Sequence, residues 1–250
     1  KPAPDTPVTA AVMGELALEA GFPAGVFNVV SSADPVMAGE TLVTDPRVDV
    51  ISFPGSTGVG KRIMEKGAAT LKRVFLELGG KSANIILDDA SDFAMSVMQS
   101  IVIFHAGQGC AIPTRLFVPR SRYEEALKAL EMAYAGFATK WGDFDDPTQV
   151  MGPVISARQR DRVMEYIALG QKEGARLLTG GKARTDKGGG FFIEPTCFVD
   201  VRNEMRIARE EIFGPVLVVI PYEDDEDAIR LANDSDYGLG GSVIGGDKAR

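Results

Sequence analysis

The residues that decide the fold are "VDVISFPGSTGVGKRIMEKGAATLKRVFLEL", residues 48–78. An apolar run at 48–53 is typical of a buried strand, a Gly/Ser/Thr turn follows it, and residues 61–71 have a helical pattern. A second apolar run at 73–78 returns to a strand pattern. Strand, helix and strand joined by short connections predict a parallel sheet covered by helices, so we expect an α/β fold.

The alternation continues on both sides of this stretch. Before it, the sequence predicts helices over residues 5–20 and 34–43 with a short buried strand at 26–30 between them. After it, the predicted elements are strands at 83–87, 114–118, 176–180, 191–199, 216–222 and near residue 244, helices at 91–106, 121–138, 157–175 and 224–234, and a Gly/Lys-rich surface loop at 180–190.

Adjacent glycines mark the expected domain boundary. Gly79 and Gly80 permit a change of chain direction, which divides the chain into residues 1–79 and 80–250. The chain opens without a methionine and stops within a strand and turn pattern. We therefore expect an internal segment of a longer chain.

Composition narrows the range of functions. The chain has 250 residues, of which 45% are hydrophobic and 25% charged, and its formal net charge is −8. An acidic chain without a basic cluster is a poor candidate for binding nucleic acid or an anionic membrane. No apolar run is as long as a membrane span, and two cysteines with one histidine argue against a disulfide scaffold and a zinc site. These features predict a cytoplasmic protein without a metal.

The turn "PGSTGVG" at residues 54–60 is a candidate anion site. A strand ends there and a helix begins, which aims backbone N–H groups and the positive end of the helix at a negative group. Gly55 and Ser56 are the candidate contacts, with the Ser56 hydroxyl as an added donor. A tight turn without a ligand is the alternative, because the motif is neither a dinucleotide fingerprint nor a P-loop.

Glu77, in "LELGGK" at residues 76–81, is a candidate general base. It ends an apolar strand between two leucines, and apolar surroundings favour the neutral form of a carboxyl group. A base that works near neutral pH needs such a setting. The alternative is an ordinary carboxylate at the end of a strand, paired with a lysine such as Lys81.

Cys110 lies in "GQGC" at residues 107–110, in a loop between a predicted helix and a predicted strand. Loops on rigid scaffolds often carry function. The glycines between His105 and Cys110 give no support for a Cys–His pair, so a reactive thiolate would need backbone dipoles, a carboxylate base or a bound cation. The alternative is a structural cysteine. Cys197 is interpreted as a small buried strand residue.

The segment "REEIFGPVLVV" at residues 209–219 places two acids before an aromatic residue, a Gly-Pro pair and a β-branched strand. In an extended chain Glu211 and Phe213 would share one side. A carboxylate beside an aromatic ring could bind a ribose diol and pack against a flat heterocycle. An ordinary loop with Phe213 in the core is the alternative.

These segments in this order, with "KPAPDTP" at residues 1–7 and "GFPAGVFNVV" at 21–30, resemble the NAD(P)-dependent aldehyde dehydrogenase superfamily over essentially the whole chain. The combination of "LELGGK", "GQGC" and "EEIFGP" is highly specific. The resemblance implies that residues 1–79 are the C-terminal part of a Rossmann-like dinucleotide-binding domain. Residues 80–250 would belong to an α/β catalytic domain that is truncated at its C-terminal end, in a homodimer or homotetramer.

The resemblance also implies a chemistry. Cys110 would attack the aldehyde carbonyl to give a thiohemiacetal, hydride would pass to the nicotinamide, and Glu77 would activate the water that hydrolyses the thioester to a carboxylic acid. No metal takes part. The implied cofactor contacts are Lys1 at the adenosine ribose, Gly55 and Ser56 at the pyrophosphate, Gly79, Glu211 at the nicotinamide ribose, and Phe213 beside the nicotinamide.

The sequence departs from the family pattern at three points, and three alternative functions are open. His105 stands where Asn is common in the family, and Pro4 stands where many members carry an acid that disfavours a 2′-phosphate, so NAD is expected and NADP is not excluded. Within residues 1–250, the Cys110 backbone N–H is the one candidate oxyanion donor. The alternatives are a CoA-acylating semialdehyde dehydrogenase, whose members often lack the base at the Glu77 position, a non-catalytic nucleotide-binding relative, and a thiol esterase.

Overall fold

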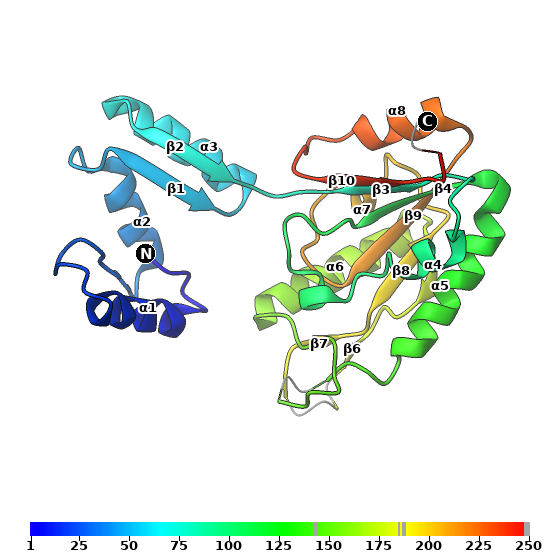
Figure 1. Cartoon of the computed structure of the whole chain (residues 1–250), viewed down its shortest axis with the longest axis horizontal. Coiled ribbons are helices and arrows are strands. Elements are labelled where there is room, and N and C mark those ends of the chain that lie inside the picture. Colours follow the sequence, from blue (N-terminus) through cyan, green and yellow to red (C-terminus); the bar gives the residue numbers. More distant parts are fainter. Residues whose placement is uncertain (143–144, 185, 187–188, 248–250) are drawn as a thin grey trace. The chain divides into compact units, whose positions relative to one another are not determined.

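The structure is a computed structural model that describes residues 1–142, 145–184, 186 and 189–247 (Figure 1). It divides the chain into two compact units, Lys1–Leu78 (unit 1) and Gly79–Arg250 (unit 2). The division falls one residue before the expected boundary. Each unit is described by itself.

Unit 1 is built around two parallel strands, β1 (Val50–Pro54) and β2 (Arg73–Glu77), in register from Val50 opposite Arg73 to Pro54 opposite Glu77. The expected strand–helix–strand arrangement is confirmed. The helices of unit 1 are α1 (Pro7–Glu19), α2 (Pro35–Thr44), α3 (Thr57–Gly67) and the short η1 (Ala68–Thr70).

The starts of α2 and α3 follow from capping side chains. The Asp34 carboxylate accepts hydrogen bonds from the backbone N–H groups of Val36 and Met37, which fixes the first turn of α2. Ser56 caps α3 in the same way, through a hydrogen bond from the Val59 N–H to its hydroxyl oxygen. Helix α3 therefore begins four residues before the expected position.

The predicted strand at residues 26–30 is absent from the structure. These residues form a turn and an irregular segment, and Val26 is 65% exposed. Within the described part of unit 1 the strand pairing is that of β1 with β2. An isolated apolar run without a neighbouring strand has no partner for its backbone groups and does not form a strand.

Unit 2 is organised around a six-stranded sheet in the order β10-β3-β4-β9-β8-β5. Neighbouring strands are parallel except β5 and β8, which are antiparallel. The strands are β3 (Ala83–Ile86), β4 (Arg115–Pro119), β5 (Arg176–Thr179), β8 (Thr196–Val199), β9 (Val216–Tyr222) and β10 (Gly241–Ile244), with β6 (Ala183–Arg184) and β7 (Phe192–Ile193) as a separate antiparallel pair.

Helices cover both faces of this sheet. The helices of unit 2 are α4 (Phe93–Met98), η2 (Phe104–Gly107), η3 (Arg120–Arg122), α5 (Tyr123–Phe137), α6 (Ala157–Lys172), α7 (Arg206–Arg209) and α8 (Asp225–Asn233). Alternate residues of β9 point to opposite faces, so Val218 packs in one cluster with α6, α7 and α8, and Val219 packs in the other with α4 and α5 (Figure 1). The six-stranded sheet thus forms the middle of three layers, with its four inner strands β3, β4, β9 and β8 buried.

Two predicted elements are interrupted. The helix expected over residues 91–106 ends at Met98, because the β-branched run Ile101–Ile103 disfavours a helix and Val102 is buried in the core. The strand expected over 191–199 is broken into β7 and β8 at Pro195, which cannot donate to a ladder. Residues 185, 187 and 188 of the predicted loop lie outside the described residues.

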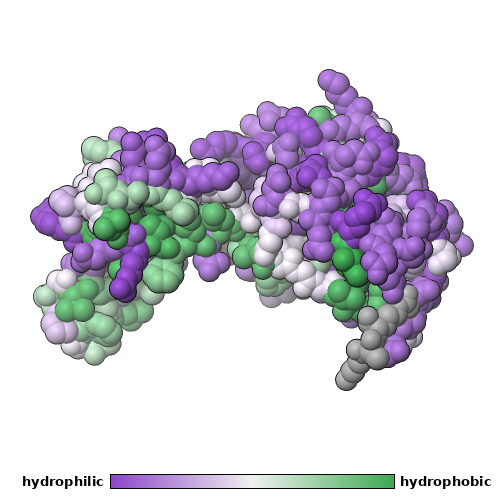
Figure 2. Space-filling model, turned by 90° about the horizontal axis from the view of Figure 1, so that it is seen from above, coloured by the Kyte–Doolittle hydropathy of each residue, from purple (hydrophilic) through white to green (hydrophobic). Residues whose placement is uncertain are grey.

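The two units differ in surface character. Figure 2 shows apolar residues over much of the visible face of unit 1 and mainly polar residues over unit 2. Val8, Met13, Phe22, Val26 and Phe75 of unit 1 are each more than half exposed. In the described parts of the chain, no helix combines the length and apolar character needed to cross a membrane.

We predict that the kink before β4 tolerates no side chain at Gly107. This residue has φ +72°, and a Cβ added to it would lie 1.9 Å from the Gly214 carbonyl oxygen. Gly107→Ala should lower the free energy of unfolding by about 3 kcal/mol or more. Gly136 in α5 is the control, because its added Cβ would meet nothing within 4 Å. Gly136→Ala should raise stability by up to about 1 kcal/mol in the same denaturation experiment; equal stability of both variants would contradict the prediction.

Two cationic side chains, Lys81 and Arg115, are buried in unit 2, with 2% and 3% of their surface exposed. Burial and, to a smaller extent, the neighbouring Arg115 charge lower the pKa of Lys81 to about 7, although Glu211 and Glu210 oppose the shift. Between about pH 7 and the ordinary lysine value, the unfolded chain therefore binds more protons than the folded protein.

Stability should consequently rise with pH over this window, by at most about 1.4 kcal/mol per pH unit from this one group. Lys81→Met removes the cost of the buried ammonium group. The stability advantage of Lys81→Met over the wild type should be largest near pH 7 and shrink toward about pH 10. Denaturant unfolding of both proteins across this range measures it, and an advantage that is independent of pH would contradict the low pKa of Lys81.

Candidate active site

Cys110 is exposed and lies in the loop between η2 and β4. The loop is pressed against the segment that leads into β3, because a Cβ added to Gly80 would lie 2.3 Å from the Cys110 carbonyl oxygen. Real Cβ atoms do not approach an oxygen this closely. The backbone of Cys110 therefore occupies space that is open only because residue 80 is a glycine.

Gln108 ties the cysteine loop to a distant segment. Its side-chain oxygen accepts a hydrogen bond of 2.9 Å from the Ile155 backbone N–H, and its side-chain nitrogen donates to the His105 carbonyl oxygen at 3.2 Å. Our reading of the sequence gave Gln108 no role. One feature of the sequence could have indicated this role: Gln108 stands between two glycines, which have no side chains, so it is the residue able to anchor this part of the loop.

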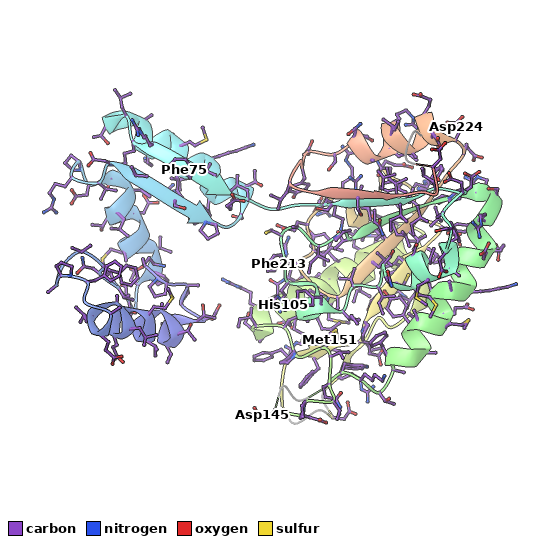
Figure 3. All side chains as sticks on the ribbon, viewed as in Figure 1. Phe75, His105, Asp145, Met151, Phe213 and Asp224 are labelled. Atoms are coloured by element: carbon purple, nitrogen blue, oxygen red, sulfur yellow. The ribbon has the colours of Figure 1, made fainter. Side chains whose placement is uncertain are left out.

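His105 makes contacts that do not involve Cys110. Its imidazole stacks on the Phe104 ring, with 4.1 Å between ring centroids and an angle of 17° between the planes. Its backbone is left-handed, with φ +48°, and its side chain is exposed (Figure 3). The ring is therefore paired with a neighbouring aromatic residue at the kink.

The two adjacent acids of "EEIFGP" have different environments. Glu210 is held by its neighbours: Arg206 donates to it at 2.6 Å, and the Tyr166 hydroxyl donates at 2.6 Å. The Arg206 hydrogen bond keeps the pKa of Glu210 below its usual range. Glu211 instead accepts a hydrogen bond of 3.1 Å from the Gly80 N–H. A Cβ added to Gly79 would lie 2.4 Å from its carboxylate, so this approach needs a glycine at residue 79.

Phe213 is exposed and has a strained backbone. Its side chain is 37% exposed, whereas the side chain of Ile212 is buried, so Phe213 is not the core residue of the alternative interpretation. Its φ of +59° is unusual for a bulky residue and differs from the extended chain that we expected. The Gln159 side chain holds this turn by donating to the carbonyl oxygens of Ile212 and Phe213, at 3.1 and 2.7 Å.

Three of the predicted motifs meet at one edge of the unit 2 sheet. The segment Gly79–Ser82 enters β3, the Cys110 loop enters β4, and Glu211–Pro215 enters β9. These strands are parallel neighbours, so their amino ends lie at the same edge. Ligands of open α/β sheets usually bind at the carboxyl ends of strands. The candidate site in unit 2 uses the opposite edge.

In unit 1, the structure brings Gly55, Ser56 and Glu77 together. Gly55 donates a backbone hydrogen bond of 2.9 Å to the Glu77 carbonyl oxygen, at the carboxyl ends of β1 and β2. The Glu77 side chain is exposed. The expectation of apolar surroundings for it is wrong, because strand alternation turns its neighbours Leu76 and Leu78 to the opposite face, where a Cβ added to Gly60 would touch them.

The residues that follow Lys1 in the sequence, beginning with Pro2, line part of a cavity of about 440 Å³ in unit 1. Its ammonium group donates to the Pro2 carbonyl oxygen at 2.9 Å. The cavity is lined by Pro2, Ala3, Pro4, Pro7, Ser31, Ser32, Ala33 and Pro35, at the start of α1 and α2. No acidic side chain is among these lining residues, and Pro4 is one of them.

The candidate residues thus form two sets. Unit 1 holds Lys1, Gly55, Ser56 and Glu77, and unit 2 holds Gly79, Cys110, Glu211 and Phe213. Glu77 and Cys110 belong to different units, and their convergence stays a prediction. Among the described residues, no group of three or more His, Cys, Asp and Glu side chains could hold a metal ion.

Comparison with known proteins agrees with the motifs. The family model described as "Aldehyde dehydrogenase family" matches residues 1–250. Geranial dehydrogenase from Castellaniella defragrans is 46% identical over 244 residues, which are 97% of this chain and 50% of that protein. The chain spans about half the length of the curated relatives it matches.

Solved structures that are similar to this chain include aldehyde dehydrogenases as well. An aldehyde dehydrogenase from Mycobacterium tuberculosis, solved with NAD+, is 47% identical with a TM-score of 0.91 over 97% of this chain and 50% of that chain. An aldehyde dehydrogenase from Pseudomonas syringae, solved as a mutant with NAD+ and octanal, is 40% identical with a TM-score of 0.91 over 96% and 50%. The order of the motifs, the fold of both units and the match over all 250 residues lead to one conclusion: the chain belongs to the aldehyde dehydrogenase family.

Proposed function

We propose that the protein oxidises an aldehyde to a carboxylic acid, with NAD+ as the hydride acceptor and Cys110 as the nucleophile. The observation that carries this proposal is the contact of the exposed Cys110 loop with Gly80, whose N–H binds Glu211. The backbone of the proposed nucleophile and a candidate ribose-binding carboxylate thus approach the same glycine pair. The relatives solved with NAD+ support the choice of cofactor.

The residues present fit a dinucleotide. Helix α3 starts at Thr57, after its capping residue Ser56 and with two residues between it and the end of β1, so the N–H groups of its first turn are suited to a pyrophosphate. The cavity lined by Pro2 and Pro4 has room for the adenosine part. In unit 2, Glu211 would accept from the ribose hydroxyls, and the exposed Phe213 ring would pack beside the nicotinamide. With Pro4 in place of an acid, we propose NAD+ and leave use of NADP+ open.

Cys110 would act first. Its thiolate sulfur bonds to the aldehyde carbon, and the Cys110 N–H donates to the oxygen on which negative charge develops. NAD+, when bound, supplies the acceptor for the hydride of this carbon. Cys110 then carries a thioester. Water gives a proton to Glu77 and attacks the acyl carbon, the C–S bond breaks, and the acid leaves with the thiolate restored.

Chain connectivity supports the role of Glu77. Gly80 follows Glu77 by three positions in the sequence, so their Cα atoms are at most about 11 Å apart whatever the arrangement of the units. Gly80 in turn contacts the Cys110 carbonyl. A glutamate side chain and one hydrogen-bonded water molecule can together span a distance of about 11 Å. Assembly into a homodimer or homotetramer and a cytoplasmic location stay predictions of the sequence.

Replacement of the two cysteines tests the nucleophile. We predict that Cys110→Ala in the intact protein reduces aldehyde-dependent formation of NADH to the background rate, because no covalent intermediate forms. Cys197→Ala is the control: this thiol is buried in β8, burial raises its pKa, and the variant should keep at least about half of the wild-type rate. Equal rates for wild type and Cys110→Ala would eliminate the proposed nucleophile.

Replacement of Glu77 separates hydrolysis from acyl transfer to CoA. Glu77→Gln should still release one burst of NADH per site, followed by turnover that is slower by about 10²–10⁴-fold, because the acyl-enzyme lacks its base. Exposed Glu65 on α3 supplies the control variant Glu65→Gln, which should keep the wild-type rate. Product analysis of the wild type with and without CoA should give the free acid in both cases. An acyl-CoA product would instead identify a CoA-acylating enzyme.

A further inference from the structure

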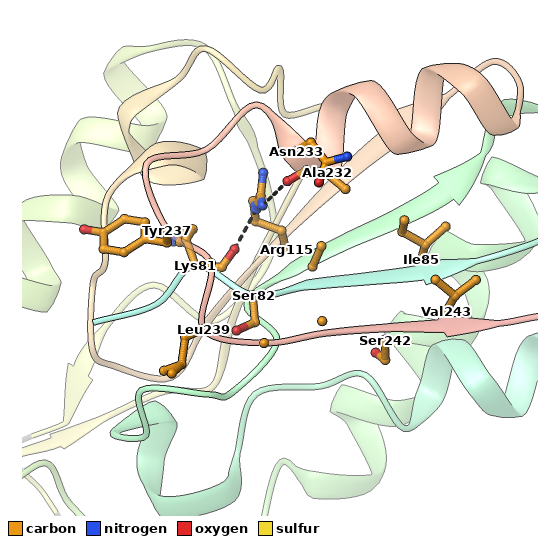
Figure 4. A pocket seen from close by; sticks show the side chains of 14 residues that line it. Lys81, Ser82, Ile85, Arg115, Ala232, Asn233, Tyr237, Leu239, Ser242 and Val243 are labelled. Atoms are coloured by element: carbon orange, nitrogen blue, oxygen red, sulfur yellow. Dashed lines mark hydrogen bonds between the residues drawn. The ribbon is translucent and has the colours of Figure 1, made fainter. Parts of the chain in front are cut away.

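Arg115 is a buried cation whose hydrogen-bond acceptors are all uncharged. It is the first residue of β4, five residues after Cys110, and 3% of its surface is exposed. Its Nε donates to the Lys81 carbonyl oxygen at 2.8 Å (Figure 4). Its two terminal nitrogens donate to the carbonyl oxygens of Leu231 and Ala232 and to the Asn203 side-chain oxygen, at 3.2, 2.8 and 3.2 Å.

Burying a charge without a carboxylate partner is costly for stability. A hydrophobic side chain at the start of β4 would avoid that cost. The guanidinium group, however, presents donors in a rigid planar fork, which fixes the relative position of several acceptors at once. The contacts of Arg115 therefore favour a role in geometry over a role in stability alone.

The acceptor Lys81 lies directly beside the catalytic contacts. The preceding residue, Gly80, donates its N–H to Glu211 and leaves room for the Cys110 carbonyl oxygen. Because β4 begins at Arg115, the same residue also fixes the end of the cysteine loop, and its own backbone N–H donates to the Ser82 carbonyl oxygen at 3.2 Å. The side chain of Arg115 thus binds the Lys81 carbonyl oxygen, and its backbone N–H binds the Ser82 carbonyl oxygen.

We propose that Arg115 is a positioning residue: through the Lys81 carbonyl it sets the position of the Gly79–Gly80 segment against the Cys110 loop. The inference rests on the proposed function, because the position of this segment matters for the rate only if Cys110 is the nucleophile. A loss of about 1 Å in placement can cost about 100-fold in rate.

Asn203 offers a matched control on the other side of the same network. Its side-chain nitrogen donates to the carbonyl oxygens of Leu231 and Asp234 and to the Asp234 carboxylate, so it holds the end of α8. Asn203→Ala removes buried hydrogen bonds but leaves the bond from Arg115 to Lys81. A purely structural network would respond alike to changes at either residue.

The test compares Arg115→Lys with Asn203→Ala in the intact protein, after the melting temperature of each is measured. Arg115→Lys keeps the positive charge and loses the fork. We expect kcat to fall at least about tenfold, with the KM for aldehyde within about threefold, and the rate of Cys110 alkylation by iodoacetamide without cofactor to fall at least about threefold. Asn203→Ala should change each quantity by less than about twofold.

Two results would overturn the proposal: wild-type kcat and alkylation in Arg115→Lys, or equal changes in both variants at equal loss of melting temperature. If Arg115→Lys does not fold, Gly80→Ala displaces the same segment with Arg115 intact, and unchanged alkylation of Cys110 in that variant is a further negative result. The alkylation rate needs neither aldehyde nor NAD+. A wild type without dehydrogenase activity would therefore defeat the proposed function, while the alkylation comparison would still decide the positioning role.

Discussion

The candidate site depends on a steric constraint: the Cys110 carbonyl oxygen needs the space that a side chain at residue 80 would fill. This constraint brings the cysteine loop, the segment entering β3 and the Glu211 carboxylate to one place. Gly79 and Gly80 serve different neighbours, since the first leaves room for Glu211 and the second for Cys110. The glycine pair is therefore a packing requirement as well as a change in chain direction.

The position of the site follows from topology. In unit 1, Gly55, Ser56 and Glu77 lie at the carboxyl ends of parallel strands, as is usual for α/β folds. In unit 2 they lie at the amino ends of β3, β4 and β9. The short segment Leu78–Ser82 leaves the carboxyl end of β2 and enters the amino end of β3, so one covalent connection joins both edges.

Much of the fold could be predicted from local patterns. Apolar runs, capping residues and short connections were enough for the parallel strands β1 and β2 and for helices α2, α5, α6 and α8. Tertiary context decided the rest. Residues 26–30 are apolar but have no strand beside them, and the run Ile101–Ile103 ends a helix that its periodicity alone would continue.

The residues of the candidate site were named in the sequence from motifs, but their supports were not. Glu77 has leucine neighbours in the sequence and is exposed in the strand, since alternation separates sequence neighbours in space. Gln108, Gln159 and Arg115 bind these segments through hydrogen bonds to residues more than 30 positions away. Long-range hydrogen bonds of this kind leave no periodic signal, so only the three-dimensional structure identified them.

The placement of the unit 2 site also frees the other edge of its sheet. The connections that follow β3, β4 and β9, near Asp88, Ser121 and Asp224, lie at the carboxyl ends of these strands, a full strand length from the cysteine loop. A reactive side chain introduced at exposed Ser121 would consequently hold a fluorophore or a solid support at the edge of the sheet opposite the candidate site.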